Sequence, residues 1–461
     1  MKQDTAAKTM IISSCLFFGL ALTVGILTAL KFVVPTVGDI EYLSMPRLRM
    51  LHTNINLFGW LLQANMGILF WILPRILHTK LFSEKLGVAM AVLYNLTLIG
   101  AVTCIDLGIV KNVEYGEIPP PFDYLVAVCW VLFAVNVFGT VAIRKVKYLY
   151  VSVWYALGAV IWTTFVYITG NMLSQMPMVT GTNQANLVWF YVHNAVGLIF
   201  TPLGVAIAYY LIPKQLDTPI YSHKLSMIGF WVISFVYVWT GAHHMIHGPS
   251  PHWLQTVAII FSFSLIIPVV AVITNFFGTY ATAPRGTRML GPIPKLLMMG
   301  TVYYIFTCLQ GPFQAIRSVN EITSKTDWVV GHAHMALFGA FSYYAMAGIY
   351  YIAPKLAGRK LYSEKLGDLH FWLMTLASIP FFAVLWIGGV IQGFAWLNPE
   401  NTFVETLAAL KHAHWMRFVS GSVIFGSYFL FFYNIMQTFF GKYGKDAAAE
   451  TVVAGQEEVE S

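Results

Sequence analysis

The fold is decided by residues 328–353, WVVGHAHMALFGAFSYYAMAGIYYIA, a run without a charged residue that holds two histidines near its start. An apolar helix of about 20 residues crosses the hydrocarbon core of a bilayer. Similar runs recur along almost the whole chain and do not show the alternation that a β-barrel needs. They predict spans at roughly 10–34, 50–74, 86–109, 122–143, 150–171, 186–212, 224–247, 254–278, 294–315, 328–353, 368–395 and 413–440. We therefore expect an all-α polytopic membrane protein, a bundle of about 12 transmembrane helices.

The composition agrees with this fold class. Of the 461 residues, 58% are hydrophobic and 10% are charged, whereas a soluble domain carries about 25% charged residues. The connections are short, so we expect a single transmembrane catalytic domain over residues 1–445. Residues 446–461 are predicted to form a polar, disordered cytoplasmic tail. None of the four cysteines forms a CxxC or CxxCH pair, which argues against disulfides and against a covalently attached heme.

The loop charges predict the orientation of the bundle. One set of loops, together with both termini, carries 19 of the 27 lysines and arginines, and the opposite set carries 8. Basic loops stay in the cytoplasm, so both termini are expected there and the chain is expected in a bacterial inner membrane. The net charge of +7 reflects this orientation and does not indicate nucleic-acid binding.

Six histidines lie at one predicted depth, in the outer third of the membrane, on four different spans. They are His52, His193, His243, His244, His332 and His334. A single histidine inside a span is as easily a hydrogen-bonded packing residue as a ligand. Six of them at one level favour metal or heme ligation, because histidine is the commonest protein ligand for copper, iron and heme.

The spacing of these histidines divides them into sets. His332 and His334 point about 200° apart on a helix and cannot bind one metal, but they can hold two groups on opposite faces of the tenth span. His243 and His244 are about 100° apart and sit at a helix end, where local loosening would let both reach one ion. With His193 as the third ligand they make a plausible copper site.

The chain resembles the catalytic subunit of heme-copper oxygen reductases, specifically the C family of cbb-type cytochrome c oxidases, over almost its whole length. The stretches that carry the resemblance are RLRMLHTN, VEYGEIP, WFYVHNAVG, YVWTGAHH, TDWVVGHAH, LYSEKLGDLHFWL and IGGVIQGFAW. The resemblance implies the subunit I fold of heme-copper oxidases. It also implies the function of a terminal respiratory oxidase, which reduces O2 to water with four electrons, takes up protons and pumps them.

The resemblance assigns ligands residue by residue. His52 and His334 become the axial ligands of a low-spin heme b, and His332 becomes the proximal ligand of a high-spin heme b. The copper ion (copper B) falls to His193, His243 and His244. Tyr237 matches the tyrosine that this family joins covalently to a copper-ligand histidine, here His193, and its phenol can supply an electron and a proton together.

Two further sites are expected near the outer surface. The family places a calcium ion at the loop that matches Glu114 and Glu117, with Glu114 the stronger candidate, and carboxylates suit such a hard cation. Arg47 and Arg49 lie close to His52 in sequence and can pair with heme propionates. The alternatives are solvated glutamates and arginines that anchor the chain at the membrane interface.

Electrons must arrive from other chains, and the resemblance implies membrane-anchored heme c subunits that are fed by cytochrome c. Protons must come through hydroxyls, amides and water, since acidic residues are nearly absent from the spans; Ser234 is a candidate step, although such a hydroxyl often bonds its own helix backbone. At Gln310 the C family usually has a glutamate. The substitution places the efficiency of proton pumping in question more than O2 reduction.

Nitric oxide reduction and secondary transport are the alternative functions. Nitric oxide reductases share the fold but carry glutamates around a non-heme iron, at positions where this chain has Gly197 and, by our alignment, Leu265. Three imidazoles without a carboxylate suit copper, and Tyr237 also favours O2. A transporter would show broken helices and polar sites at the midplane instead of six imidazoles near one surface.

Overall fold

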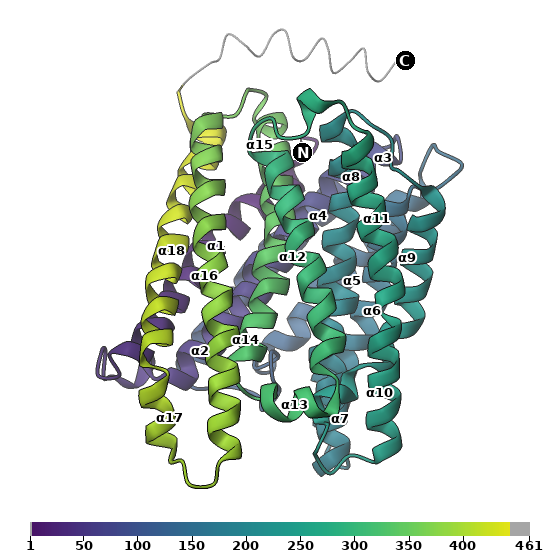
Figure 1. Ribbon diagram of the computed structural model, residues 1–461. Helices are drawn as coiled ribbons and strands as arrows, with labels where there is room; N and C mark the ends of the chain where they lie inside the picture. The colour runs from purple at the N-terminus through teal and green to yellow at the C-terminus, as the bar shows by residue number, and fades with distance from the viewer. Residues whose placement is uncertain (1, 443–461) are drawn as a thin grey trace.

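Twelve helical spans form one bundle in the computed structural model, which describes residues 2–442 (Figure 1). The predicted tail, residues 446–461, lies outside the described residues. Within the described part there is no strand, so the predicted fold class is confirmed. Seven spans are single or nearly single helices: α1 (Thr5–Val33), α4 (Glu84–Asp106), α5 (Phe122–Ala142), α6 (Val151–Asn171), α12 (Pro292–Gln314), α16 (Glu364–Leu397) and α18 (Lys411–Phe440).

Three composite spans form the centre of the bundle, and each is an α-helix, a π-helical segment and a second α-helix in continuous succession. They consist of α2 (Met45–Asn54), 55–62 and α3 (Gln63–Ile76); α7 (Gly181–Asn194), 195–200 and α8 (Thr201–Leu216); and α14 (Asp327–His334), 335–342 and α15 (Tyr343–Ala357). Their most apolar windows are 100%, 94% and 83% buried, and α3, α8 and α15 contact one another. The other spans therefore surround these three.

The π-helical segments mark the candidate ligands. Each begins one to three residues after a predicted histidine: after His52, after His193, and after the pair His332 and His334. A π-helical turn widens the backbone, is rare, and occurs mostly at functional sites. The same local irregularity at the same place in three helices indicates a shared structural role.

A threefold internal repeat organises the loops at one end of the bundle. After each central helix the next helix begins at a serine N-cap: Ser83, Ser222 and Ser363. The backbone of each serine exchanges two hydrogen bonds with one buried asparagine side chain, 2.8–3.1 Å long, from Asn136, Asn275 and Asn434 respectively. The repeat fixes how each central helix turns into its outer neighbour.

Two predicted spans depart from a straight helix. The span expected at 254–278 is divided at Leu265 into α10 (His252–Ser264) and α11 (Ile266–Thr282), because Pro268 lacks the N–H that would continue the ladder to Ser264. The span expected at 224–247 is α-helical only over α9 (His223–Val236) and continues as 3-10 turns at Tyr237–Trp239 and Gly241–Met245. The local loosening expected at His243 and His244 is thus confirmed.

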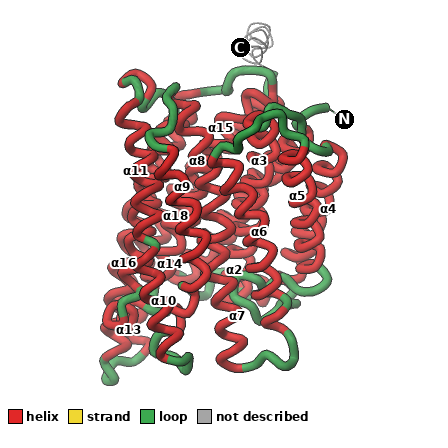
Figure 2. The backbone as a smooth tube through the Cα atoms, turned by 90° about the vertical axis from the view of Figure 1, so that its right-hand side faces the viewer, coloured by secondary structure: helices red, strands yellow, loops and turns green. Residues whose placement is uncertain are grey.

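The two ends of the bundle differ. The start of α1, the end of α18 and the ends of α3, α8 and α15 lie at the upper end of Figure 1. The short helices α13 (Arg317–Thr323) and α17 (Phe403–Ala409) lie at the lower end, as the turned view also shows (Figure 2). The helices that carry the histidines, α2, α7 and α14, occupy the lower half.

Candidate metal centre

His193, His243 and His244 form a compact cluster. His193 comes from the end of α7, and the other two come from the 3-10 turn at Gly241–Met245. One ring nitrogen from each lies within 4.8 Å of those of the other two, and His193 Nδ1 is 3.0 Å from His244 Nε2. Such a set of nitrogens can bind one small metal ion.

The backbone of the 3-10 turn allows adjacent histidines to share this cluster. A 3-10 helix is narrower than an α-helix, and the turn packs directly on α7. A Cβ atom at Gly241 would lie 3.0 Å from the carbonyl oxygen of Trp189, so glycine allows the close approach of the turn to α7. The combination of glycine and 3-10 backbone places His243 and His244 against α7.

Neighbouring side chains orient the three rings. His243 Nδ1 is 2.6 Å from the Ser262 hydroxyl, and the His244 ring stacks on Trp189 at 4.4 Å between centroids. Partners of this kind fix the orientation and tautomer of metal-binding histidines. His193 Nε2 is buried and has no hydrogen-bond partner, so the remaining nitrogen of that ring is unsatisfied.

Tyr237 lies beside His193. The ring centroids are 4.8 Å apart and the ring planes differ by 21°. The Tyr237 ring also packs against the π-helical segment 195–200 that follows α7. A Cβ atom at Gly197 in this segment would come within 1.7 Å of Tyr237 Cζ. The space that a side chain at Gly197 would need is therefore filled by Tyr237.

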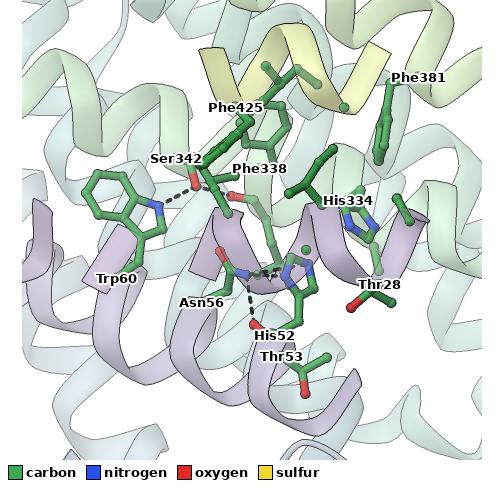
Figure 3. A pocket seen from close by; sticks show the side chains of 18 of the residues that line it. Thr28, His52, Thr53, Asn56, Trp60, His334, Phe338, Ser342, Phe381 and Phe425 are labelled. Atoms are coloured by element: carbon green, nitrogen blue, oxygen red, sulfur yellow. Dashed lines mark hydrogen bonds between the residues drawn. The ribbon is translucent and has the colours of Figure 1, made fainter. Parts of the chain in front are cut away.

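His52 and His334 face each other across an apolar cavity (Figure 3). Their centroids are 6.0 Å apart and their planes differ by 20°. Each Nδ1 bonds a backbone carbonyl, of Ala21 at 2.9 Å and of Val330 at 2.8 Å, so Nε2 is the candidate ligand atom of each ring. Metal–imidazole bonds of about 2.0 Å on both sides of one ion, plus about 1 Å from each nitrogen to its ring centre, require roughly this separation.

The cavity between these two rings suits a flat apolar ligand. Its wall includes Gly25, where a Cβ atom would lie 2.5 Å from the His52 ring, and the aromatic side chains Trp60, Phe338 and Phe381. The donor set and the shape fit a bis-histidine heme.

His332 points away from this cavity. Its Nδ1 is 3.2 Å from the side-chain oxygen of Gln310 on α12, and it lies within electrostatic range of His193, His243 and His244. The structure thus separates His332 from His334, as their spacing predicts. Gln310, the position at which the C family usually has a glutamate, is thus a direct hydrogen-bond partner of His332.

The predicted outer-loop residues form an ionic cluster. Arg49 donates to Glu114 Oε1 at 2.7 Å, and its other terminal nitrogen is 3.9 Å from Glu117 Oε1. The other Glu117 oxygen accepts from Asn54 at 2.7 Å. Burial raises the pKa of Glu117, and its Oε1 has no hydrogen-bond partner. These oxygens could serve a cation, although Arg49 contacts both carboxylates, and the calcium site stays a prediction.

Arg47 contacts other protein groups and does not line the cavity between His52 and His334. It pairs with Glu41 and donates to the backbone carbonyl of Asp106 at 2.9 Å. The assignment of Arg47 and Arg49 to propionates stays a prediction.

Arg417 is the cationic residue that sequence reasoning missed. It is 9% exposed and lines the cavity between His52 and His334. Its Nη1 is 3.6 Å from Asp327 Oδ1 and has no hydrogen-bond partner. The signal was present in the sequence, since an arginine inside an apolar run needs a functional partner.

The hydroxyl of Ser234 donates to the backbone carbonyl of Phe230 at 2.6 Å, which is the alternative considered for it, and its place in a proton path stays a prediction. Paired hydroxyls occur instead between α12 and α15, where Thr301 and Tyr344 are 3.0 Å apart.

Comparisons with known proteins agree on one family. Residues 5–423 match the family described as cytochrome c and quinol oxidase polypeptide I. The chain is similar to the Cbb3-type cytochrome c oxidase subunit CcoN1 of Stutzerimonas stutzeri, with 31% identity over 90% of each chain. It is also similar, at 25% identity over 91% of each chain, to a nitric oxide reductase chain of the same organism. A solved heme-copper terminal oxidase dimer shares the fold, with a TM-score of 0.81 and 17% identity over 96% of this chain and 84% of the other.

Proposed function

The chain belongs to the cytochrome c and quinol oxidase polypeptide I family, and on that premise we propose that it is the catalytic subunit of a C-family cytochrome c oxidase that reduces O2 to water. The observation that carries the proposal is the presence of two separate histidine sets in one bundle. His52 and His334 oppose each other at 6.0 Å, while His193, His243 and His244 share one cluster.

The residues present fit the cofactors that the family implies. His52 and His334 would hold a low-spin heme b, His332 a high-spin heme b, and the three-histidine cluster a copper ion. When bound, these groups supply the electrons that O2 reduction needs at one place. Calcium at Glu114 and Glu117 belongs to the same proposal.

The protein's own side chains provide positioning. Four of the six imidazoles donate from Nδ1 to protein oxygens, which are the backbone carbonyls of Ala21 and Val330 and the side-chain oxygens of Gln310 and Ser262. Such partners hold a ligating histidine in one tautomer and orientation. His332 and His334 are two residues apart on α14, so this helix would connect the two heme sites directly. The Tyr237 hydroxyl, beside His193, would give up a proton and an electron to the reacting oxygen.

Reduction of O2 is favoured over reduction of NO by the contact between Gly197 and Tyr237. A glutamate at position 197 would serve a non-heme iron with a hard oxygen ligand. Its Cβ alone would overlap the Tyr237 ring. A chain with tyrosine at this place cannot also carry that glutamate without moving the ring.

The remaining proposals concern partners and placement. Electrons would come from cytochrome c through membrane-anchored heme c subunits, because the chain has no covalent heme motif of its own. The chain would cross the bacterial inner membrane with both termini in the cytoplasm and the metal centres near the periplasm. Ser234 and the hydroxyl pair of Thr301 and Tyr344 are candidate steps for proton uptake, and residues 1–445 are the proposed catalytic domain.

The test uses the purified complex. We expect two b-type hemes, one of which binds carbon monoxide, one copper per chain, and faster consumption of O2 than of NO. Tyr237→Phe should keep both heme spectra and lose O2 turnover. Non-heme iron without copper, together with NO consumption, would instead assign the chain to the nitric oxide reductases.

A further inference from the structure

The central helices end in a threefold arrangement of aromatic and cationic residues. Each helix carries an aromatic residue, two intervening residues, a proline and a cation, in the sequences WILPR, YLIPK and YIAPK. The cations are Arg75, Lys214 and Lys355, and all three line one cavity at this end of the bundle. The arrangement follows the three central helices and lies at the opposite end of the bundle from the six candidate ligand histidines.

The aromatic residues form the floor of this cavity. The rings of Trp71, Tyr210 and Tyr351 have centroids 5.9–6.4 Å apart and meet edge to face. The backbone reverses just beyond the cations, at residues of positive φ: His78 (50°), Asp217 (47°) and Gly358 (64°). The three turns therefore contribute to the cavity wall, whose lining includes His78, Asp217 and Gly358.

The cavity wall is strongly basic. Its lining includes seven lysines and arginines and two carboxylates; the cations are Arg75, Lys80, Lys145, Lys214, Lys355, Arg359 and Lys360, and the carboxylates are Asp217 and Glu364. Like charges that face a common space repel one another and attract anions. Seven of the chain's 27 lysines and arginines thus line one hollow.

Helix stabilisation explains only part of this charge. A cation in the last turn of each central helix favours the negative end of the helix dipole. Arg75 also pairs with Asp4 at 2.8 Å, and Arg359 donates to the carbonyl oxygens of Phe439 and Gly441. Lys80 and Lys145 belong to exposed loops beyond the helix ends. Basic loops orient the bundle, but orientation does not require these two lysines to line one hollow.

We propose that this basic cavity binds a ligand with clustered phosphate groups, of the class of nucleoside triphosphates and inorganic polyphosphates. Lys80, Lys145 and Lys214 line the hollow and present separate positive charges, which match the several negative charges of such a group. Lysine acts as a point charge toward phosphate. The same chemistry occurs in anionic phospholipid headgroups. The inference does not depend on the proposed oxidase chemistry.

The experiment uses the purified complex in a neutral detergent at low salt. Displacement of a fluorescent ATP analogue by ATP and by tripolyphosphate reports binding. The test variant is Lys145→Gln with Lys214→Gln, and Lys145→Gln alone serves if the double variant fails to assemble. The matched control is Lys147→Gln, in the same loop, exposed and outside the cavity. Heme absorbance verifies assembly of each.

We expect saturable binding that the double variant weakens about tenfold or more and the control leaves unchanged, since a lost charge-assisted contact is worth roughly 1.5 kcal/mol or more. Tripolyphosphate that competes as well as ATP assigns the site to phosphates. Loss of binding in nanodiscs with anionic lipid, but not with neutral lipid, identifies the headgroup as the source. Absence of saturable binding, or equal weakening by Lys147→Gln, would overturn the proposal.

Discussion

Single residues decide which polar groups the interior of the bundle can hold. Histidines in apolar spans were identifiable from the sequence because an imidazole inside a membrane is costly without a partner. Arg417 obeys the same rule, yet its role depends on lining the cavity between His52 and His334, which a sequence does not reveal. Gly197 matters through the Tyr237 ring that fills its side-chain space.

Gly197→Ala tests that contact. The added methyl group must displace the Tyr237 ring, so we expect intact heme spectra with O2 turnover reduced about tenfold or more, the penalty of misplacing a reacting group. Gly426→Ala is the control, because nothing lies within 4 Å of its added Cβ. Equal activities of the two variants would show that the position of Tyr237 is not required.

Gln310→Glu tests the hydrogen bond to His332. A carboxylate in place of the amide would add negative charge behind a heme ligand and stabilise the oxidised iron. The midpoint potential of the high-spin heme should fall by on the order of tens of millivolts, while that of the low-spin heme stays constant. Spectroelectrochemical titration of the variant measures both; an unchanged high-spin potential would separate Gln310 from that heme.

Helices were predictable as elements, whereas most of their irregularities were not. Length and hydropathy determine a span, and twelve were expected and found. The loosening at Gly241–Met245 was expected, because two adjacent histidines can reach one ion only where the helix loosens. The π-helical segments were not expected, because they depend on packing between helices, which local sequence does not encode. The serine and asparagine joints did leave a signal, in the repeated stretches FSEKLG, YSHKLS and YSEKLG, which becomes recognisable as a repeat once the three joints are seen to be alike.

Asn275→Ala tests the joint between α9 and α11. The fully buried amide bonds both the N–H and the carbonyl of Ser222, so its removal leaves two partly buried backbone groups without these partners. The expected loss of stability is about 2–4 kcal/mol, seen as a lower midpoint of thermal unfolding. Asn401→Ala, at an exposed loop position, should change the midpoint little; similar midpoints for the two variants would refute a structural role for the joint.

At the scale of the whole molecule, the basic cavity and the candidate ligand histidines lie at opposite ends of the bundle. The basic cavity is lined by residues at the ends of α3, α8 and α15. The metal-ligand candidates lie on α2, α7, α14 and the 3-10 turn at Gly241–Met245, toward the other end of the bundle (Figure 1). The number of spans and the loop charges made this polarity predictable. Which surfaces receive other subunits was not, because partner contacts leave no periodic pattern.

Cysteine labelling in whole cells tests the orientation. Lys147→Cys and Asn401→Cys place exposed thiols at opposite ends. The loop charges place Lys147 in the cytoplasm, so a membrane-impermeant thiol reagent applied from outside should modify only Asn401→Cys. Both sites should react after the membrane is opened. The reverse pattern in intact cells would invert the proposed topology.

The central claim is that six imidazoles hold two hemes and one copper ion, and anomalous X-ray diffraction from crystals of the complex at the iron and copper edges tests it most directly. We predict one copper peak among His193, His243 and His244, and one iron peak on each side of α14, the first between His52 and His334 and the second next to His332. Iron in place of copper at the three-histidine cluster, or no iron between His52 and His334, would contradict the assignment.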